Sequence, residues 1–462
     1  MIPLASLPQL LVDHLPAHLA RQRWSGAHGR AIRSIDLRWH EVVRDDAAAG
    51  LVWALVDVAF ADDADTQAYQ VFIGVRPVDD TSFLPRDDRR RLTVVPGDRG
   101  PVAMYDALAD PELAIDVLHL VDPGAEVSTH HPLVLEHSNT SIVYDSKKIL
   151  KVFRRVEPGP NPDVEIPRKL AEQGFEHQLP PLAELRRDDT DLAVLRRFLS
   201  GSIEGWELAA SSVRDLLDAG CAPDEAGGDF GPEARRLGAV LAGLHLAIAD
   251  AWGTRPGDPA RWAAEMDGQL RQLADSGADL GDHRLDVASV AERYRELAEL
   301  DDVGVDQRIH GDLHLAQVLL ADEGWYVLDF EGEPARRREE RATTSSPLRD
   351  VAGMLRSFHY AAATGLAQWT IGDPDPALDP ALAEAAQAWD EHCRQAFLDG
   401  YFGVDGIDAL LPVEPEHRQA VLAAFELDKA VYEVGYELGY RPDQVWIPLQ
   451  RIDRLTHAGA AR

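Results

Sequence analysis

The spacing of apolar residues divides the chain into a strand-rich part and a helical part. Short apolar runs at 133–135, 142–144 and 149–153 are separated by polar turns, which is the pattern of β-strands. From Trp206 onward apolar residues recur every three or four positions, as in 237–248, and this spacing predicts amphipathic helices. Strands first and helices afterwards indicate an α+β fold rather than a doubly wound parallel sheet.

The same pattern predicts three regions, which are a small α+β unit at 1–90, a second β-rich unit at 91–200 and a helical unit at 201–462. Within the helical unit we expect helices near 287–299, 381–400 and 416–438. Across the boundary of the first two units, the polar stretch 76–99 predicts a long loop, and 101–122 in the second unit predicts a helix.

Composition narrows the possible partners and the compartment. The chain has 462 residues and a formal net charge of −33, which argues against nucleic acid and anionic membranes because both bind through lysine and arginine. The two cysteines, Cys221 and Cys393, do not indicate a disulfide framework. No apolar run approaches ~20 residues, and no basic leader precedes the first apolar residues. We therefore expect a cytoplasmic protein without a membrane span.

The densest group of chemically useful residues lies at 310–333. The pentapeptide HGDLH, with Asp312 at its centre, is followed by Gln317 and then by Asp329 in the tripeptide DFE. Protein kinases place a catalytic Asp, a metal-binding amide and a metal-binding Asp in this order. One base and two oxygen ligands for Mg²⁺ are a sensible minimum for phosphoryl transfer, which depends on positioning and charge neutralisation.

The residues between these groups support the same interpretation. Apolar runs at 318–320 and 325–328 flank an Asp-Glu-Gly turn and predict a β-hairpin, which would bring Gln317 and Asp329 to the same end. An ordinary turn beside a strand-end carboxylate is the alternative. His310 and His314 also have a spacing that zinc sites use, but no further ligands accompany them, so we expect His310 to orient the loop.

A second part of the predicted site lies in the β-rich region. Lys151 sits inside an apolar strand, where an ammonium group is costly unless an anion pairs with it. Binding to ATP phosphates would meet that cost, and a lysine pointing to solvent is the alternative. Glu165 is the candidate partner of Lys151, although Pro167 is unusual so close to it in a helix. Ser138, Asn139, Thr140 and Ser141 occupy the hairpin where protein kinases bind phosphate, here without glycine.

These motifs together resemble the bacterial maltokinases, relatives of the aminoglycoside phosphotransferases. The resemblance spans nearly the whole chain and rests on RQRW at 21–24, SNTSIVY at 138–144, ILKVFRRVEPGPNPD at 149–163, HGDLHLAQVL at 310–319, LDFEGEP at 328–334, SPLRDVAGMLRSF at 346–358 and LDKAVYEVGYE at 427–437. It implies a protein-kinase-like two-lobe fold, with a cap at 1–90, a nucleotide-binding lobe at 91–200 and a helical lobe at 201–462 that holds the sugar.

The resemblance also implies an activity and a set of roles. Such enzymes transfer the γ-phosphate of ATP to the anomeric hydroxyl of maltose, and the maltose 1-phosphate feeds glycogen and α-glucan synthesis. Asp312 would be the base, Gln317 and Asp329 would hold Mg²⁺, Lys151 would bind ATP phosphates, and Glu165 would hold Lys151. Arg349-Asp350 would support the catalytic loop. A monomer is expected, with a trehalose-to-maltose isomerase as a possible partner.

A sugar site is predicted on the helix near 416–438. Tyr432 with Tyr436, and Glu433 with Glu437, are four residues apart and form adjacent aromatic and acidic stripes. His310 and Glu331 are further candidates for contact with the substrate. The alternative is a packed tyrosine face beside solvated glutamates.

Other functions remain open at this stage. The same machinery would serve a kinase that acts on glucosamine or on an aminoglycoside. A pseudokinase that binds nucleotide or glucan without catalysis is an alternative from another class, although Lys151, Asp312, Gln317 and Asp329 argue against it.

Overall fold

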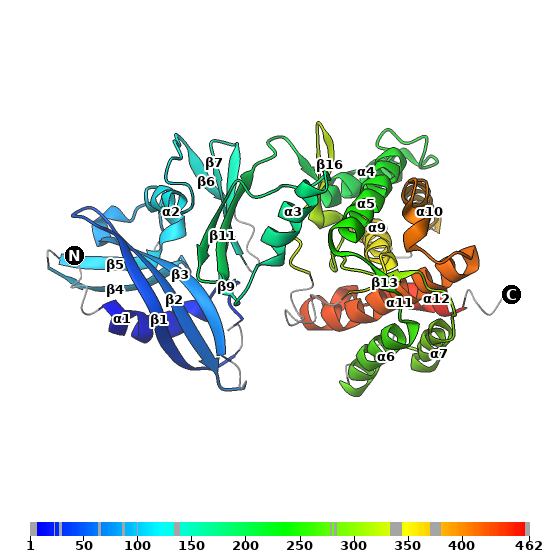
Figure 1. Cartoon of the computed structure of the whole chain (residues 1–462), viewed down its shortest axis with the longest axis horizontal. Helices are drawn as coiled ribbons and strands as arrows, with labels where there is room; N and C mark the ends of the chain where they lie inside the picture. The colour runs from blue at the N-terminus through cyan, green and yellow to red at the C-terminus, as the bar shows by residue number, and fades with distance from the viewer. Residues whose placement is uncertain are drawn as a thin grey trace. The chain divides into compact units, whose positions relative to one another are not determined.

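The computed structural model describes the chain except for residues 1–6, 23, 27–29, 63–65, 86–87, 99, 134–138, 278–279, 281–283, 333–343, 370–379 and 458–462. Its internal contacts divide it into two units, of which the first comprises Met1–Arg168 and Leu179–Ser200 and the second Lys169–Gln178 and Gly201–Arg462. Figure 1 shows that strands dominate the first unit and helices the second. Within the described ranges, no helix has both the length and the apolar character needed to cross a bilayer.

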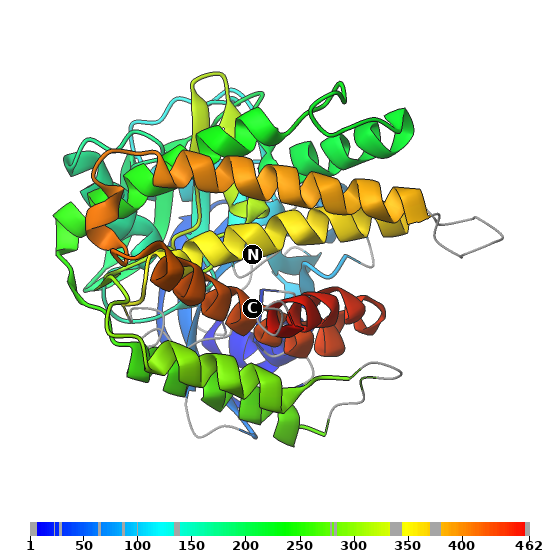
Figure 2. The same ribbon diagram turned by 90° about the vertical axis from the view of Figure 1, so that its right-hand side faces the viewer.

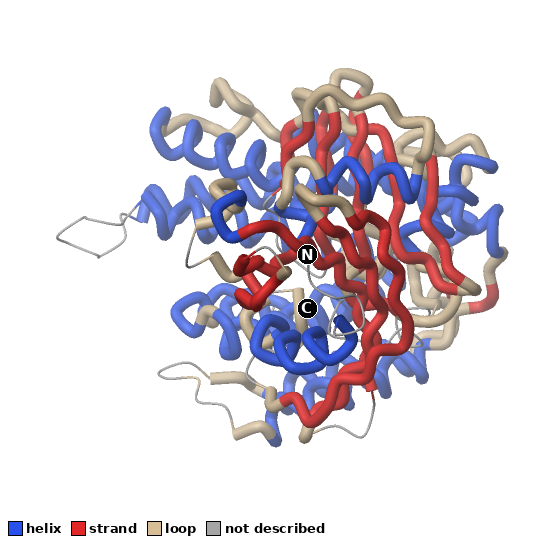
Figure 3. The backbone as a smooth tube through the Cα atoms, turned by 90° about the vertical axis from the view of Figure 1, so that its left-hand side faces the viewer, coloured by secondary structure: helices blue, strands red, loops and turns tan. Residues whose placement is uncertain are grey.

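The first unit begins with helix α1 (Leu7–Leu19) and a six-stranded antiparallel sheet in the order β1-β2-β3-β5-β4, with β9 paired to β3. These strands are β1 (Ile32–Asp45), β2 (Gly50–Phe60), β3 (Thr66–Pro77), β4 (Arg91–Gly97), β5 (Gly100–Asp106) and β9 (Arg155–Val156). Figure 3 shows the strands of this unit side by side.

Both faces of this sheet are covered, which explains the unbroken apolar run in β2. Val52, Ala54 and Val56 belong to one core, with α1. Leu51 and Trp53, which alternate with them, belong to a second core that the next sheet shares. Alternate residues of a strand point to opposite faces, so a strand buried on both sides needs apolar residues at every position. Each fully buried large side chain contributes about 1.5–3 kcal/mol to stability.

The second sheet of the first unit has the order β10-β11-β8-β7-β6. Its strands are β6 (His130–Leu133), β7 (Asn139–Tyr144), β8 (Lys148–Phe153), β10 (Ala183–Arg187) and β11 (Thr190–Arg197), and α2 (Leu113–Val121) packs in the core it shares with the first sheet. Helix α3 (Pro162–Glu172) follows β9.

Two local predictions were wrong in this region. The stretch 76–99 contains β4, and 101–122 begins as strand β5 before helix α2 starts at Leu113. Strand β5 pairs with both β3 and β4, so its conformation depends on partners that local spacing does not reveal. The first sheet therefore extends past residue 90, and the predicted domain boundaries stay a prediction.

The second unit is mainly helical. Its helices are α4 (Gly205–Ala219), α5 (Gly231–Trp252), α6 (Pro259–Asp275), α7 (Val287–Ala298), α9 (Leu348–Trp369), α10 (Pro380–Phe402), α11 (Pro415–Tyr440) and α12 (Trp446–His457). Helix α9 packs against α10 and α11, α5 packs against α10, and α6 packs against α11 (Figure 2). The helices predicted near 287–299, 381–400 and 416–438 are confirmed.

Two small sheets complete the second unit. Strands β15 (Val318–Ala321) and β16 (Gly324–Val327) form the predicted hairpin, with β12 (Ile203–Glu204) paired to β15. Strands β13 (Arg255–Pro256) and β14 (Val305–Asp306) pair separately.

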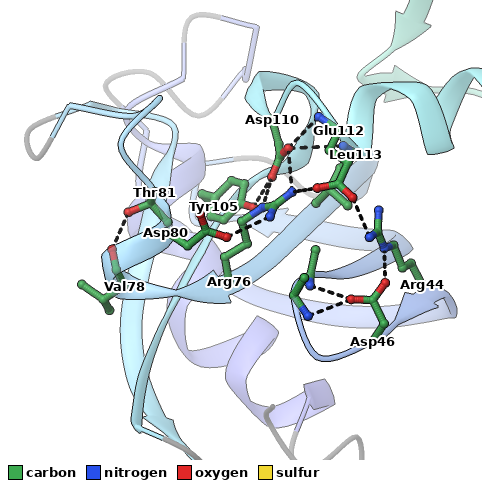
Figure 4. A network of polar contacts seen from close by, with 12 residues as sticks. Arg44, Asp46, Arg76, Val78, Asp80, Thr81, Tyr105, Asp110, Glu112 and Leu113 are labelled. Atoms are coloured by element: carbon green, nitrogen blue, oxygen red, sulfur yellow. Dashed lines mark hydrogen bonds and ion pairs between the residues drawn. The ribbon is translucent and has the colours of Figure 1, made fainter.

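An ion-pair network fixes α2 to the first sheet (Figure 4). Arg76 of β3 is buried and donates from Nε to Asp110 Oδ2 at 2.6 Å and from Nη2 to Glu112 Oε2 at 2.6 Å. Tyr105 of β5 donates to Asp110, and Arg44 of β1 reaches Glu112 from the other side at 2.6 Å. The network therefore joins three strands to the start of α2.

Replacement of Arg76 by methionine should lower the free energy of unfolding by about 3–5 kcal/mol, because it leaves the carboxylate of Asp110 buried without its cation. Urea unfolding measures this loss. Arg38→Met is the matched control, since Arg38 pairs with Asp57 on the exposed surface, where a pair contributes about 0–1 kcal/mol. Equal losses in the two variants would contradict the role of the buried network.

The same network makes the free energy of unfolding depend on pH. Burial raises the pKa of Asp110, but the hydrogen bonds from Arg76 and Tyr105 outweigh it, so the pKa lies below the ordinary 3.8. A depressed pKa in the folded state adds stability above the unfolded value, and this stability is lost as the pH falls. The difference in the free energy of unfolding between the native protein and Arg76→Met should therefore become smaller below pH 3.8. A difference in the free energy of unfolding that stays constant down to about pH 2.5 would contradict the lowered pKa of Asp110.

Candidate active site

The loop at 310–313 is held by backbone hydrogen bonds to one buried carboxylate. Asp350, in the first turn of α9, accepts from the N–H of His310 and from the N–H of Gly311, each at 2.8 Å. Gly311 has a φ of +87°, which L-residues with a side chain rarely adopt. Asp312 therefore directly follows two residues, His310 and Gly311, whose backbone is held by hydrogen bonds.

Asp350 is itself oriented by buried neighbours. The Nε2–H of His245 in α5 donates to Asp350 Oδ2 at 3.2 Å, and His245 Nδ1 lies 2.8 Å from the hydroxyl of Tyr401 in α10. Burial raises the pKa of Asp350, but the hydrogen bond and charge of His245 outweigh it, and the pKa lies below its usual value. The carboxylate is therefore charged at neutral pH. The predicted support of the catalytic loop by Asp350 is confirmed.

His310 uses its ring to hold the loop in place. The ring nitrogen Nε2 lies 2.8 Å from the carbonyl oxygen of Leu328. A carbonyl only accepts, so Nε2 carries the proton, and Nδ1 accepts from the N–H of Asp312 at 3.4 Å. The ring packs on Phe330 with a centroid distance of 5.0 Å. His310 is thus a buried orienting residue, which confirms that expectation and corrects its inclusion among substrate contacts.

The β15–β16 hairpin brings the proposed metal ligands together. Gln317 Nε2 lies 3.3 Å from Asp329 Oδ2, and the N–H of Leu328 donates to the carbonyl oxygen of Gln317 at 2.9 Å. Asp329 has a φ of +61°, a strained conformation for a residue with a side chain. Carboxylate and amide oxygens are ligands that Mg²⁺ accepts, so these residues fit the metal. A carboxylate oxygen of Glu331 lies within 4.8 Å of a carboxylate oxygen of Asp329. Glu331 is therefore close to the Gln317–Asp329 pair, and it does not line the cavity between α6 and α11.

A cavity of about 660 Å³ lies between α6 and α11 in the second unit. It is lined by Trp262, Glu265, Met266, Gln269, Gln272, Leu273, Ser276, Arg349, Phe425, Asp428, Val431, Tyr432, Gly435, Tyr436, Leu438 and Tyr440. A narrow space of about 10 Å³ adjoins it, bounded by Gly311, Asp312 and Leu313 on one side and by Asp428 and Tyr432 on the other. The small space therefore lies between residues of the larger cavity and Asp312.

The predicted aromatic stripe lies in this cavity, and the acidic stripe does not. Tyr432 and Tyr436 line the cavity. Glu433 faces α9 and accepts from Arg356 at 2.7 Å, and Glu437 faces the same helix and accepts from the hydroxyl of Tyr360 at 3.1 Å. Successive helical residues are about 100° apart, so the two stripes face different surroundings. Burial raises the pKa of Glu433 despite the adjacent Arg356.

Polar groups other than these glutamates line the cavity or lie beside Asp312. Asp428 accepts from Gln269 Nε2 at 3.0 Å, and both residues line the cavity together with Glu265 and Arg349. Lys429 Nζ lies 3.1 Å from Asp312 Oδ1. None of these contacts was predicted from the sequence. A lysine inside the apolar repeat of α11 was a signal, whereas nothing local to α6 marked Gln269.

In the first unit, Lys151 is paired with an acidic residue of α3. Its Nζ lies 2.8 Å from Asp163 Oδ2, and Arg196 Nη1 lies 3.1 Å from the same oxygen. Burial raises the pKa of Asp163, but Arg196 and Lys151 outweigh it and hold the pKa far below its usual range. The structure thus gives Asp163 the role predicted for Glu165. Glu165 lies two positions further along α3 and is partly exposed, whereas Asp163 begins the helix beneath the sheet.

The proposed phosphate hairpin is described in part. Ser138 lies outside the described residues. Asn139, Thr140 and Ser141 begin strand β7, where Ser141 pairs with Lys151 across the ladder. Thr140 Oγ1 accepts from Arg154 Nε at 2.8 Å. Strand pairing therefore brings Ser141 to the lysine that the sequence assigned to phosphate binding.

The second unit holds a loop-bound aspartate and an amide–carboxylate pair on a hairpin, and the first unit holds a paired strand lysine, which are the residue types that kinase-type phosphotransferases use. Two family models match the chain, one described as the phosphotransferase enzyme family over residues 231–410 and one as the maltokinase N-terminal cap domain over residues 18–110. Residues 231–410 thus carry the pattern of the phosphotransferase enzyme family, and residues 18–110 carry that of a maltokinase-type cap. The predicted fold class and family resemblance are confirmed.

Named relatives are glucosamine kinases. That of Streptacidiphilus jiangxiensis is 27% identical over 370 residues, which cover 76% of this chain and 80% of the relative. That of Mycolicibacterium smegmatis (strain ATCC 700084 / mc(2)155) is 26% identical over 349 residues, covering 71% and 80%. A solved glucosamine kinase in complex with glucosamine, ADP and inorganic phosphate covers 98% of this chain and 100% of its own at 21% identity, with a TM-score of 0.65. This structure shows the same fold.

Helix α9 packs closely against the loop at 310–313, and Gly353 is its point of contact. A Cβ atom at Gly353 would lie 2.6 Å from the carbonyl oxygen of Leu313, so Gly353→Ala should displace the loop. We expect a loss of about 1–3 kcal/mol in stability and a fall of about 10²-fold in phosphotransferase turnover.

Gly268→Ala in α6 is the matched control, because nothing lies within 4 Å of a Cβ there. It should keep turnover and stabilise the helix by about 0.5–1 kcal/mol. Thermal unfolding and turnover of the two variants decide the point. Unchanged turnover in Gly353→Ala would show that the loop does not depend on this contact.

Proposed function

We propose that the protein transfers the γ-phosphoryl group of ATP to a hydroxyl group of a sugar, with Mg²⁺ as the metal. The observation that carries this proposal is the cavity between α6 and α11, which shares five lining residues with the small space beside Asp312. Cavities of about 300–1,000 Å³ with a few polar groups are typical small-molecule sites. A kinase acting on a large protein would have no need of a cavity of this size near its base.

Each residue has a defined task in this reaction. Asp312 accepts the proton of the attacking hydroxyl as its oxygen bonds to the γ-phosphorus and the bond from phosphorus to ADP breaks. Lys151, held by Asp163, binds phosphate oxygens of the nucleotide. Mg²⁺ held by Gln317 and Asp329 would neutralise charge on the phosphates. His310 and Asp350 keep the backbone of the loop fixed during the transfer.

Maltose is the acceptor that we propose. The maltokinase-type cap supports this choice, as does the aromatic lining of the cavity. Tyr432, Tyr436 and Tyr440 follow one face of α11, and Tyr440 is 75% exposed at its end. Aromatic rings spaced along a groove suit the apolar faces of more than one sugar ring. The product would be maltose 1-phosphate, which would feed glycogen synthesis, with a trehalose-to-maltose isomerase as a proposed partner and the monomer as the proposed state.

Glucosamine is the second candidate, favoured by a different observation. Asp428 and Glu265 both line the cavity, and carboxylates pair well with an ammonium group. The two named relatives are glucosamine kinases. An amino sugar held by Asp428 would lie next to the narrow space that leads to Asp312.

Replacement of Asp312 by asparagine tests the base. An amide cannot accept the hydroxyl proton, so turnover should fall by about 10²–10⁴-fold. ATP binding, measured by calorimetry, should survive because the proposed phosphate contacts lie elsewhere. Full activity in Asp312→Asn would end the assignment.

A coupled assay of ADP release tests the acceptor. We expect the highest kcat/KM with maltose and lower values with glucosamine and kanamycin. Asp428→Asn should raise KM for glucosamine by about 10- to 100-fold, the effect of losing a hydrogen bond to a charged group, and leave maltose nearly unchanged. Higher kcat/KM with glucosamine in the native protein would replace maltose by the second candidate.

A further inference from the structure

Lys429 of α11 lies beside the proposed base. Its Nζ is 3.1 Å from Asp312 Oδ1, and each side chain is 19% exposed. The ammonium group also lies 4.8 Å from the centre of the Tyr432 ring, and Lys429 borders the narrow space that joins the cavity to Asp312. A cation is therefore fixed where the acceptor hydroxyl and the phosphoryl group would meet.

The choice of lysine at this position is informative. The chain has 46 basic residues, of which five are lysines: Lys147, Lys148, Lys151, Lys169 and Lys429. Arginine forms buried pairs such as Arg76–Asp110 and Arg356–Glu433, whereas the other lysine in a largely buried pair is Lys151, the proposed phosphate-binding residue. A guanidinium group makes planar, two-pronged contacts, whereas an ammonium group is a compact charge on a mobile stem. A charge that has to move between two partners suits lysine.

During the transfer, negative charge is lost from Asp312 and lies on the phosphoryl group, and a mobile ammonium group can pair with each in turn. Before transfer, the ammonium group of Lys429 keeps the carboxylate of Asp312 in place. As the acceptor O–H bond breaks, its proton passes to Asp312, which becomes neutral. At the same time the O–P bond forms, the bond to ADP breaks, and negative charge lies on the transferred phosphoryl oxygens. Lys429 then loses its attraction to Asp312 and has a new anion within reach.

We propose that Lys429 is a catalytic residue that pairs with Asp312 before the transfer and donates a hydrogen bond to the transferred phosphoryl group after it. Lys429 stays protonated throughout, so no further proton acceptor is required. This inference rests on the proposed phosphoryl transfer. It differs from a role in acceptor binding, which would act on KM, and from packing on Tyr432, which would act on stability.

Lys429→Met removes the charge and keeps the apolar stem. We expect kcat with the preferred acceptor to fall by about 10²–10³-fold, as when one charge-stabilising donor is lost, with KM values for acceptor and ATP changed less than about threefold. Lys148→Met is the matched control, because Lys148 pairs with Asp122 at 3.0 Å on the first unit and should keep native kcat. An unchanged kcat in Lys429→Met, or a rise in acceptor KM alone, would overturn the proposal.

Chemical rescue separates charge from folding. Lys429→Cys in a Cys221→Ser background can be alkylated with 2-bromoethylamine, which restores an ammonium group at nearly the length of lysine. Cys393 is fully buried, and burial raises the pKa of its thiol well above the usual value, so it should not react. Mass spectrometry confirms single modification.

The aminoethylated protein should recover at least about a tenth of native kcat, whereas iodoacetamide should recover none, because its adduct is neutral. Equal recovery with both reagents, or none with complete aminoethylation, would overturn the proposal. A native protein that transfers phosphate to no acceptor would instead end the proposed function, so the two failures are distinguishable.

Discussion

The catalytic loop depends on one buried carboxylate. Asp350 accepts two backbone N–H groups, those of His310 and Gly311, and a buried charge is tolerated only when it is paired and hydrogen-bonded. His245 supplies that pairing from α5, and Tyr401 of α10 contacts the other side of the His245 ring. Three helices that are distant in sequence thus determine where Asp312 lies. The helical packing of the second unit therefore sets the position of the proposed base.

Helix α11 contributes to the site from one face and is held from another. Glu433 and Glu437 pair with Arg356 and Tyr360 of α9, which fixes the rotation of α11 about its axis. That rotation turns Asp428, Tyr432 and Tyr436 to the cavity and places Lys429 against Asp312. The glutamates predicted to bind sugar instead hold the helix that presents the cavity-lining face.

Spacing along the chain predicted what depends on neighbours in sequence. The hairpin that joins Gln317 to Asp329 and the long helices follow from local pattern, whereas the support from Asp350 was implied by the family resemblance. Partners across the fold could not be read in this way. Asp163, rather than Glu165, meets Lys151 because the start of α3 lies under the sheet, and β5 is a strand because β3 and β4 flank it. The cavity needs α6 as well as α11, and no local signal links them.

The central claim is that a sugar hydroxyl receives the γ-phosphoryl group at Asp312. Phosphorus NMR of the protein with ATP, Mg²⁺ and maltose tests it most directly, because a phosphorus–proton correlation identifies the carbon that carries the ester. We expect a new phosphate monoester whose phosphorus couples to the anomeric proton of maltose, together with an equal amount of ADP. ATP that stays intact, or that yields ADP and inorganic phosphate without any sugar ester from maltose or glucosamine, would contradict it.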